Sequence, residues 1–211
     1  PSSVNLLDNG DFENSSAADW TSTGTTALTS GAGMGGSKAM KLTGYYSTYT
    51  KASKTVTVNQ PGTQTYVLSG WAKGNAVPDT TNLSDQWRSF GLRATITYSD
   101  NSTEVHFAPF NSALSDWQFS SVAVVPKEPT KTVKSIRVEC AFESNANIAY
   151  FDNIALTREP AQTMKYDEDG NLESVTTVDQ AEDTSTYENG NLIRMVTEGY
   201  GTFEYTYDQT Y

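Results

Sequence analysis

The feature that most constrains the fold is a succession of short segments in which apolar and polar residues alternate, each ended by a turn signal. Lys54–Asn59, for example, reads Lys-Thr-Val-Thr-Val-Asn and is followed by Pro61-Gly62. Alternation with a period of two is typical of a β-strand that has two different faces. No stretch shows a convincing amphipathic helical period. The pattern therefore predicts an all-β protein built as a β-sandwich.

About ten such segments can be counted in the first three quarters of the chain. They cover residues 4–12, 25–30, 38–43, 54–59, 65–73, 90–98, 103–107, 116–125, 133–142 and 148–157. The first leads into Asn5–Glu13, which reads NLLDNGDFE, and the last contains Tyr150–Thr157, which reads YFDNIALT. We expect these two segments to bracket the sandwich and to bring Glu13 and Asp152 together.

Composition narrows the functional classes. The net charge of −11 argues against nucleic-acid binding, which needs a basic face. No apolar run approaches the ~18 residues that span a bilayer, so we expect no membrane insertion. The start, Pro1–Ser3, lacks the pattern of a signal peptide, and we interpret the chain as a processed protein or a piece of a longer one. The single cysteine, Cys140, alternates with apolar residues, which favours a buried structural thiol.

The charge balance and the sequence pattern both change near Pro160. Residues 161–211 contain two basic and eleven acidic residues, and two stretches within them are similar. Tyr166–Thr176 reads YDEDGNLESVT, Tyr187–Thr197 reads YENGNLIRMVT, and Tyr207-Asp208 begins a third unit. Each unit is predicted to form strand, Asp-Gly or Asn-Gly turn, strand. Because such hairpins cannot bury a face alone, we expect further copies in the natural protein.

This second part resembles the tyrosine-aspartate (YD) repeats of Rhs proteins and teneurins. The resemblance rests on Tyr166-Asp167, on Asp169–Leu172 and on Phe203–Asp208, and Tyr187-Glu188 departs from the family's dipeptide. It implies that residues 161–211 are a partial array of β-hairpin repeats whose partners are further YD repeats of the parent chain. It also implies a bacterial protein that is secreted or displayed at the cell surface.

Residues 1–160 resemble the jelly-roll carbohydrate-binding modules of families 4, 16 and 22, which have a galactose-binding-like fold. The resemblance rests on Asn5–Glu13, Tyr66–Lys73, Asp116-Trp117 and Phe151–Leu156, in that order and spacing. It implies a jelly-roll β-sandwich that binds a poly- or oligosaccharide without acting on it. Modules of this kind also serve as spacers or bind proteins.

The same resemblance implies a structural calcium ion. It would be held by the Asp11 carbonyl, the Glu13 carboxylate, carbonyls of Gly36–Lys38 and the Asp152 carboxylate. Ca²⁺ takes six to eight oxygen ligands of these kinds, at about 2.3–2.6 Å. The alternative is that Glu13 and Asp152 only cap turns or pair with Lys38.

A candidate sugar-binding surface follows from the alternation within the central strands. If these strands lie in one sheet, its outer face combines one aromatic ring with charged and polar groups, a mixture that suits sugars. These residues are Trp71, Arg93, Glu104, His106, Arg137 and Glu139. The alternative is a solvated face with salt bridges such as Arg93–Glu104 or Arg137–Glu139, and with Trp71 in the core.

A second candidate surface is a rim of loop aromatics. It comprises Trp20, Tyr45, Tyr46, Tyr49 and Trp87, some of which could instead cover the ends of the sandwich. Trp117 is interpreted as a core residue.

Catalysis has little support in the sequence. His106 is the single histidine and has no partner in a recognisable catalytic motif, and nothing marks Glu104 and Glu139 as an acid and nucleophile pair. The chain is therefore predicted to be non-enzymatic. The leading interpretation is a carbohydrate-binding module of an extracellular or cell-surface bacterial Rhs-type protein. The alternative is a structural or adhesive spacer that binds protein or packs on the repeat shell.

Overall fold

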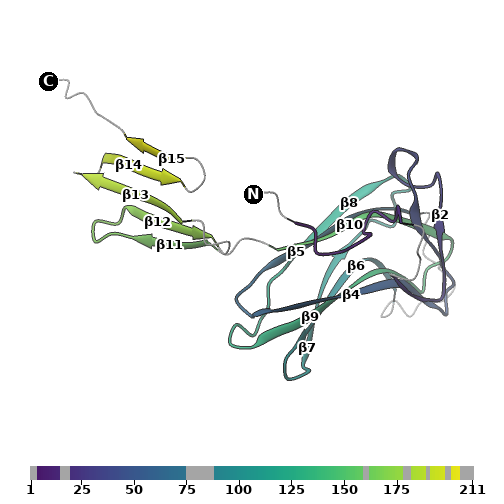
Figure 1. The fold of residues 1–211 in the computed structure, drawn as a ribbon. Coiled ribbons are helices and arrows are strands. Elements are labelled where there is room, and N and C mark those ends of the chain that lie inside the picture. Colours follow the sequence, from purple (N-terminus) through teal and green to yellow (C-terminus); the bar gives the residue numbers. More distant parts are fainter. Residues whose placement is uncertain are drawn as a thin grey trace. The chain divides into compact units, whose positions relative to one another are not determined.

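The structure, a computed structural model, describes residues 4–14, 20–74, 88–158, 162–177, 182–188, 191–197 and 201–204. The chain divides into two compact units, Pro1–Glu159 and Pro160–Tyr211. Both units are built from β-strands, as Figure 1 shows. Within the described residues, no helix has the length and apolar character needed to cross a membrane.

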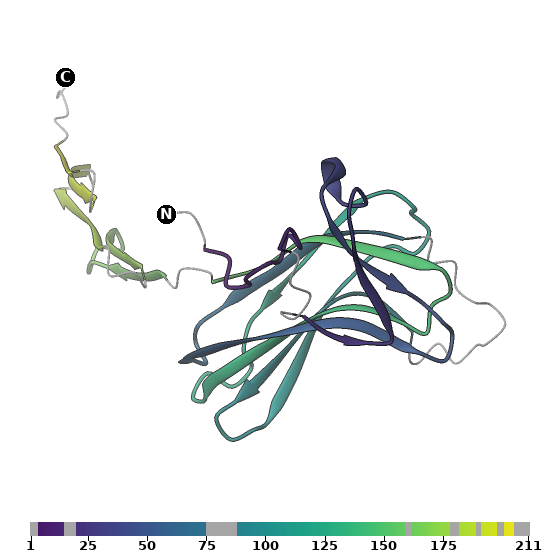
Figure 2. The same cartoon turned by 45° about the vertical axis from the view of Figure 1, so that its right-hand side comes forward.

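The first unit is a sandwich of two five-stranded antiparallel sheets. One sheet, here called the β9 sheet, has the strand order β1 (Thr21–Thr23), β4 (Tyr49–Pro61), β9 (Thr132–Glu143), β6 (Ser89–Tyr98) and β7 (Thr103–Pro109). The other, the β10 sheet, has the order β2 (Thr25–Thr29), β3 (Ala39–Thr43), β10 (Ile148–Arg158), β5 (Tyr66–Gly74) and β8 (Gln118–Val124). Figures 1 and 2 show the two layers facing each other. The predicted all-β jelly-roll fold is thereby confirmed.

Alternation along the strands separates the core from the two outer faces. In β5, Tyr66, Leu68, Gly70, Ala72 and Gly74 are buried, and the residues between them are partly exposed. The inward faces of β6 and β9 supply a further part of the core, including Leu92, Ala94, Ile96, Ile136, Val138, Cys140 and Phe142. Cys140 is a buried thiol, as predicted, and burial raises its pKa.

The two bracketing segments lie together at one side of the β10 sheet. Asn5 bridges Thr157 in an antiparallel contact, and its side chain accepts a hydrogen bond from the Leu156 N–H at 3.0 Å. The Ile154 N–H donates to the Gly10 carbonyl at 2.8 Å. A Cβ on Gly10 would lie 2.0 Å from the Ile154 carbonyl oxygen, so this position has no room for a side chain.

The second unit is a five-stranded sheet in which every strand pairs with the next along the chain: β11 (Gln162–Tyr166), β12 (Leu172–Thr177), β13 (Glu182–Glu188), β14 (Asn191–Thr197) and β15 (Gly201–Glu204). Tyr166 pairs with Leu172 and Tyr187 with Leu192, and the register shifts just before each tyrosine. The β11–β12 turn is held by Asp167, whose carboxylate accepts hydrogen bonds from the N–H groups of Asp169 and Asn171 at 3.0 and 2.8 Å. Tyr207-Asp208, the predicted third unit, lies outside the described residues.

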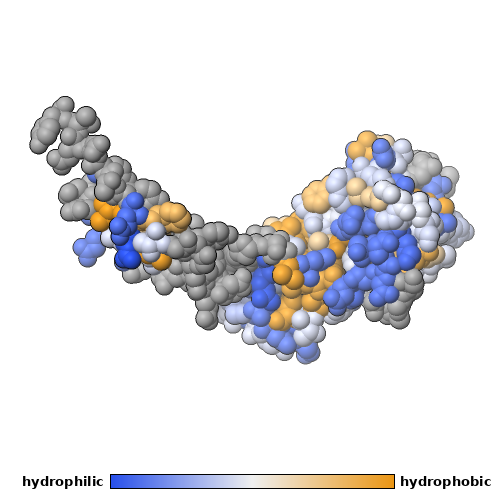
Figure 3. Space-filling view, turned by 45° about the horizontal axis from the view of Figure 1, so that its top comes forward, coloured by the Kyte–Doolittle hydropathy of each residue, from blue (hydrophilic) through white to orange (hydrophobic). Residues whose placement is uncertain are grey.

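Large apolar side chains are not confined to the core of the first unit. Val105 on β7 and Phe119 on β8 are 53% and 55% exposed. In the view of Figure 3, hydrophobic residues gather on the surface of the sandwich beside hydrophilic ones. These outward residues lie on both sheets, so both outer faces carry accessible apolar side chains.

Candidate functional site

Three of the residues predicted to form a binding face do share one face of the β9 sheet. Arg93 on β6 lies directly opposite Glu139 on β9, and Thr95 lies opposite Arg137. Directly paired residues of antiparallel strands project to the same side. Glu139 is only 2% exposed although it points away from the core, so other side chains must cover its carboxylate.

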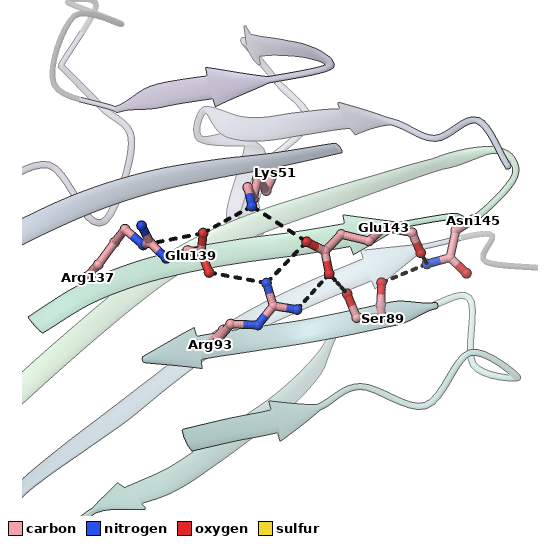
Figure 4. A network of polar contacts seen from close by, with 7 residues as sticks. All are labelled: Lys51, Ser89, Arg93, Arg137, Glu139, Glu143 and Asn145. Atoms are coloured by element: carbon pink, nitrogen blue, oxygen red, sulfur yellow. Dashed lines mark hydrogen bonds and ion pairs between the residues drawn. The ribbon is translucent and has the colours of Figure 1, made fainter. Parts of the chain in front are cut away.

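Those side chains form the charged network drawn in Figure 4. The Arg93 guanidinium donates to Glu139 at 3.2 Å and to both carboxylate oxygens of Glu143, at 3.1 and 2.6 Å. The Lys51 ammonium, from β4, lies 3.5 Å from Glu139 and 3.8 Å from Glu143. Arg137 lies 3.6 Å from Glu139 at the edge of the group. Two cations thus bridge the same two carboxylates.

The network is fixed at one end by neutral polar groups. The Ser89 hydroxyl donates to Glu143 at 2.6 Å. The buried side-chain amide of Asn145 donates to the backbone carbonyls of Ser89 and Glu143, at 2.8 and 3.1 Å. Glu143, which is 7% exposed, is therefore held from two directions. These contacts fix the position of the Glu143 carboxylate.

Burial and pairing act in opposite directions on the ionisation of the network. Burial alone would raise the pKa of Glu143, but hydrogen bonds from Arg93 and Ser89 and the charges of Arg93 and Lys51 outweigh it and lower that pKa. The hydrogen bond to Glu143 raises the pKa of Arg93, against the opposing effect of burial. The Glu143–Arg93 pair is therefore ionised at neutral pH.

Small residues and two aromatic rings complete this face. Ala141 on β9 lies between the two glutamates and opposite Gly91 on β6. A Cβ on Gly91 would lie 2.4 Å from the Phe107 ring, so that ring covers the glycine. Phe107 is 37% exposed and Tyr49, opposite Glu143, is 48% exposed. The outer β9 face therefore presents polar groups between two accessible rings.

Glu104 and His106 were predicted on this face, and that prediction is wrong. His106 lies opposite Ala94 and Glu104 opposite Ile96, both buried core residues, so the two side chains are directed to the inner side. Glu104 there accepts hydrogen bonds from the Tyr98 hydroxyl at 2.6 Å and the Lys127 N–H at 3.0 Å, and contacts His106 at 2.6 Å. The alternative Arg93–Glu104 salt bridge is excluded for the same reason.

The grouping of Trp71 with the charged residues is also wrong. Trp71 lies on β5, in the β10 sheet, opposite Asp152 and Phe119. Its ring is partly exposed and packs against Phe119 at 5.4 Å between centroids, so it is not a core residue either. Trp117, interpreted as core, is partly exposed, with the Lys73 ammonium 4.8 Å from its ring centroid.

The predicted aromatic rim is only partly accessible. Trp20 is buried against Phe12, at 5.2 Å between ring centroids, and its indole N–H donates to the Asn9 carbonyl, so it cannot stack on a ligand. Tyr46 is exposed and packs on Tyr45, at 4.4 Å between centroids. Trp87 lies outside the described residues.

Lys51, Glu143 and Phe107 belong to the outer β9 face but were not expected there. The predicted strand ended at Phe142, one residue before Glu143, although Arg137, Glu139 and Glu143 keep a period of two. β4 begins at Tyr49, five residues before the predicted start, and so includes Lys51. Extending the alternation past the predicted end of β9 and before the predicted start of β4 would have identified Glu143 and Lys51.

The predicted metal ligands lie around the loop that precedes β3. The Lys38 N–H donates to the Glu13 carboxylate and the Lys38 ammonium donates to the Glu13 carbonyl, each at 2.6 Å. Asp152 is buried and accepts hydrogen bonds from the Met34 N–H at 2.8 Å and the Ser37 hydroxyl at 3.2 Å. Asp11 is exposed, and its carboxylate accepts from the Glu13 N–H at 3.4 Å.

The donor set of this loop consists of oxygen atoms. A Cβ on Gly33 would lie 2.3 Å from the Lys38 carbonyl oxygen, 2.3 Å from the Ser37 hydroxyl and 2.8 Å from an Asp152 carboxylate oxygen. These three oxygens therefore converge beside a residue without a side chain, and oxygens are what Ca²⁺ binds. No three His, Cys, Asp or Glu side chains in the described ranges cluster as a metal site, so carbonyls would have to complete the coordination.

Comparison of the sequence with known proteins gives a partial match. No family model matches the chain. The tRNA nuclease WapA of Bacillus subtilis (strain 168) is 31% identical over 106 residues, and the tRNA3(Ser)-specific nuclease WapA of Bacillus spizizenii is 32% identical over 106 residues. Each match covers 49% of this chain and 4% of the relative. The chain thus matches only a small part of each nuclease.

Comparison with solved structures gives the fold. The N-terminal CBM22-1–CBM22-2 tandem domain of Paenibacillus barcinonensis Xyn10C matches 76% of this chain and 51% of its own, with 19% identity and a TM-score of 0.50. A family 61 module, TmCBM61, solved in complex with β-1,4-galactotriose, matches 74% of this chain with 16% identity and a TM-score of 0.46. The similarity to the CBM22 tandem domain shows that the sandwich shares its fold.

Proposed function

We propose that the sandwich is a non-catalytic carbohydrate-binding module whose binding surface is the outer β9 face. The observation that carries the proposal is the pair of buried carboxylates, Glu139 and Glu143, held on an outward sheet face by Lys51 and Arg93. A face that serves only solubility has no need to bury charges, because burial is costly unless the charges are paired. Binding of a polar ligand accounts for their arrangement.

The chemistry of this face suits a neutral saccharide. Carboxylate oxygens accept hydrogen bonds from sugar hydroxyls, and guanidinium and ammonium groups donate to them. Tyr49 and Phe107, on either side of the network, offer rings for the C–H faces of pyranoses. The cations of Lys51, Arg93 and Arg137 and the carboxylates of Glu139 and Glu143 leave a net charge of only +1 (3 − 2), so a strongly charged ligand gains little here.

The ionisation of Glu143 favours binding over hydrolysis. A glycosidase needs one carboxylic acid whose pKa is raised, so that it can protonate the leaving group. The pKa of Glu143 is instead lowered by Arg93 and Ser89. The nuclease names of the relatives apply to whole proteins of which the match spans 4%, and the net charge of −11 does not favour nucleic acid.

The proposal extends to the setting of the module. The hairpin unit begins an array of YD repeats in a longer bacterial protein, outside the cell or at its surface. Support comes from the shared Tyr–Leu pairing of the two hairpins and from the small part of each relative that the chain matches. Asp152 and Glu13, with the Lys38 and Asp11 carbonyls, would hold a structural calcium ion that ties the first segment to β10.

Binding of neutral oligosaccharides by the full chain tests the function. We expect a glycan array to identify a neutral ligand, and calorimetry to show that Phe107→Ala and Tyr49→Ala each weaken binding by about tenfold or more. The matched control is Phe119→Ala on the β10 sheet, which should bind as the wild type does. No binding to any neutral saccharide, or equal binding by Phe107→Ala, would instead support the spacer interpretation.

A further inference from the structure

The outward face of the β10 sheet carries a second, different surface. Tyr150 on β10 lies opposite Lys41 on β3 and opposite Lys73 on β5. The Lys73 ammonium lies 5.5 Å from the Tyr150 ring centroid and 4.8 Å from that of Trp117. Four side chains thus form a row across the sheet, in which two cations alternate with two rings.

A second row lies beside the first. Trp71 packs against Phe119, and Phe119 is 55% exposed. Trp71 and Lys73 are two residues apart on β5, so they are separated by about 7 Å on the same face. Next to Lys73 is a pocket of about 440 Å³ lined by Lys73, Gly74, Ser115, Asn147, Ile148 and Tyr150. The surface therefore combines a ring platform, a cation and a hollow within the reach of one or two sugar residues.

The two lysines of this surface have no carboxylate partner among the described residues. Within the ranges that the structure describes, neither Lys41 nor Lys73 forms an ion pair. Asp152, the carboxylate opposite Trp71, is buried and accepts hydrogen bonds from Met34 and Ser37. The Asp116 carboxylate accepts from the Trp117 N–H at 2.7 Å. In a chain with a net charge of −11, two lysines on one aromatic face that lack a carboxylate partner in the described part of the chain favour an anionic ligand.

We propose that this face, the outer β10 face, is a second binding site, specific for an acidic saccharide of the uronate type. A pyranose ring stacks on Trp71 and Phe119, and its carboxylate reaches the Lys73 ammonium, with Lys41 receiving the next acidic residue of the chain. Aromatic rings stack on the C–H face of a sugar. A charged donor forms a stronger hydrogen bond with a carboxylate than with a sugar hydroxyl. The site is independent of the outer β9 face, which is nearly balanced in charge.

The charge of the ligand distinguishes this site from the one on the outer β9 face. The full chain is titrated by calorimetry with a trimer of galacturonic acid, and with the neutral galactose trimer of the same linkage. We expect the acidic trimer to bind the wild type. Lys73→Met should lower the affinity for this trimer by about tenfold, and Lys73→Arg should retain most of the affinity. Binding should weaken as salt rises, because exposed charges are screened. Trp71→Ala should also weaken binding of the acidic trimer, because Trp71 is one of the two stacking rings.

The control variant removes an aromatic ring, Phe107, from the outer β9 face. Phe107→Ala should bind the acidic trimer as the wild type does, and thermal unfolding of each variant shows whether it is folded. Absence of acidic-trimer binding, or equal binding by folded Lys73→Met, overturns the proposal. The proposal is also overturned if poly-glutamate, an acidic peptide, binds as tightly as the trimer and binds Trp71→Ala equally well. The partner would then be a protein. None of these results depends on whether neutral sugars bind the outer β9 face.

Discussion

The Arg93 guanidinium lies 2.6 Å from the Glu143 carboxylate and 3.2 Å from that of Glu139, and so holds both on one face of the β9 sheet. The two glutamates are four residues apart on β9, a separation of roughly 13 Å along an extended strand. They converge because Ala141, between them, has a side chain of one carbon. Lys51 closes the group from β4. The stability of the sandwich and its proposed binding surface therefore depend on the same cation.

Removing this cation should destabilise the protein. Arg93→Met leaves two buried carboxylates with Lys51 as their main partner, and we expect a loss of about 3 kcal/mol in the free energy of unfolding. Urea unfolding at neutral pH measures it. Arg137→Met is the control: Arg137 is half exposed and lies 3.6 Å from Glu139, so its loss should cost less than about 1 kcal/mol. Similar small losses in both variants would show that the network contributes little to stability.

Stability should fall in mild acid. The folded-state pKa values of Glu143 and Glu104 lie below the ordinary 4.5, although burial alone would raise them. Hydrogen bonds from Arg93 and Ser89 lower the pKa of Glu143. Hydrogen bonds from Tyr98 and His106 lower the pKa of Glu104. The unfolded state therefore binds protons first, so the stabilisation is complete above the ordinary pKa and is lost as pH falls through the folded values.

Thermal unfolding between pH 7 and pH 3 measures this dependence. The melting temperature should hold near neutrality and decline below about pH 5. Glu143→Gln should melt at a lower temperature than the wild type at pH 7 and should lose less stability on acidification, because one carboxylate with a lowered pKa is gone. A variant whose profile runs parallel to that of the wild type would contradict the assignment.

The fold was predictable from the sequence because alternation and turn signals are local properties. The strands around Tyr66–Lys73 and Ile136–Phe142 lie close to their predicted positions. The pairing of the first segment with β10 was also recognisable, because Asn5 and Gly10 belong to a motif whose partner is the last strand. Sheet membership is not local. The sequence alone groups Trp71 with Arg93, because neither strand carries a signal for the sheet that it joins, although the two residues lie in different sheets.

The error on β7 has a physical cause. Alternation divides Thr103–Phe107 into two faces. Placing Glu104 and His106 outward requires the apolar pair Val105 and Phe107 to face inward, as apolar residues usually do. On this edge strand the opposite holds: the Phe107 ring covers Gly91 and lies 5.8 Å from the Arg93 guanidinium. A one-residue change of register exchanges the two faces of a strand. The outer β9 face could therefore be predicted only in part.

The glycine in the first turn should tolerate no side chain. Gly10→Ala would place a Cβ 2.0 Å from the Ile154 carbonyl oxygen, which is backbone and cannot move without disturbing β10. We expect a loss of about 2 kcal/mol or more in unfolding free energy, measured by urea denaturation. Asp8→Ala, at an exposed side chain of the same turn, should change stability by less than about 0.5 kcal/mol. Equal stability of Gly10→Ala and the wild type would mean that this segment is not packed as described.

Calcium should stabilise the sandwich through the same segment. A ligand that binds the folded state alone adds about 2.7 kcal/mol at a concentration of 100 times its Kd, so the melting temperature should rise with Ca²⁺ and fall with a chelator. Asp152→Ala should lose this response, because Asp152 is the buried carboxylate of the proposed donor set. Asp116→Ala, on the exposed loop before β8, should keep it. A wild-type melting curve that chelator leaves unchanged would mean that Lys38 and the N–H donors of residues 34 and 38 already satisfy both carboxylates.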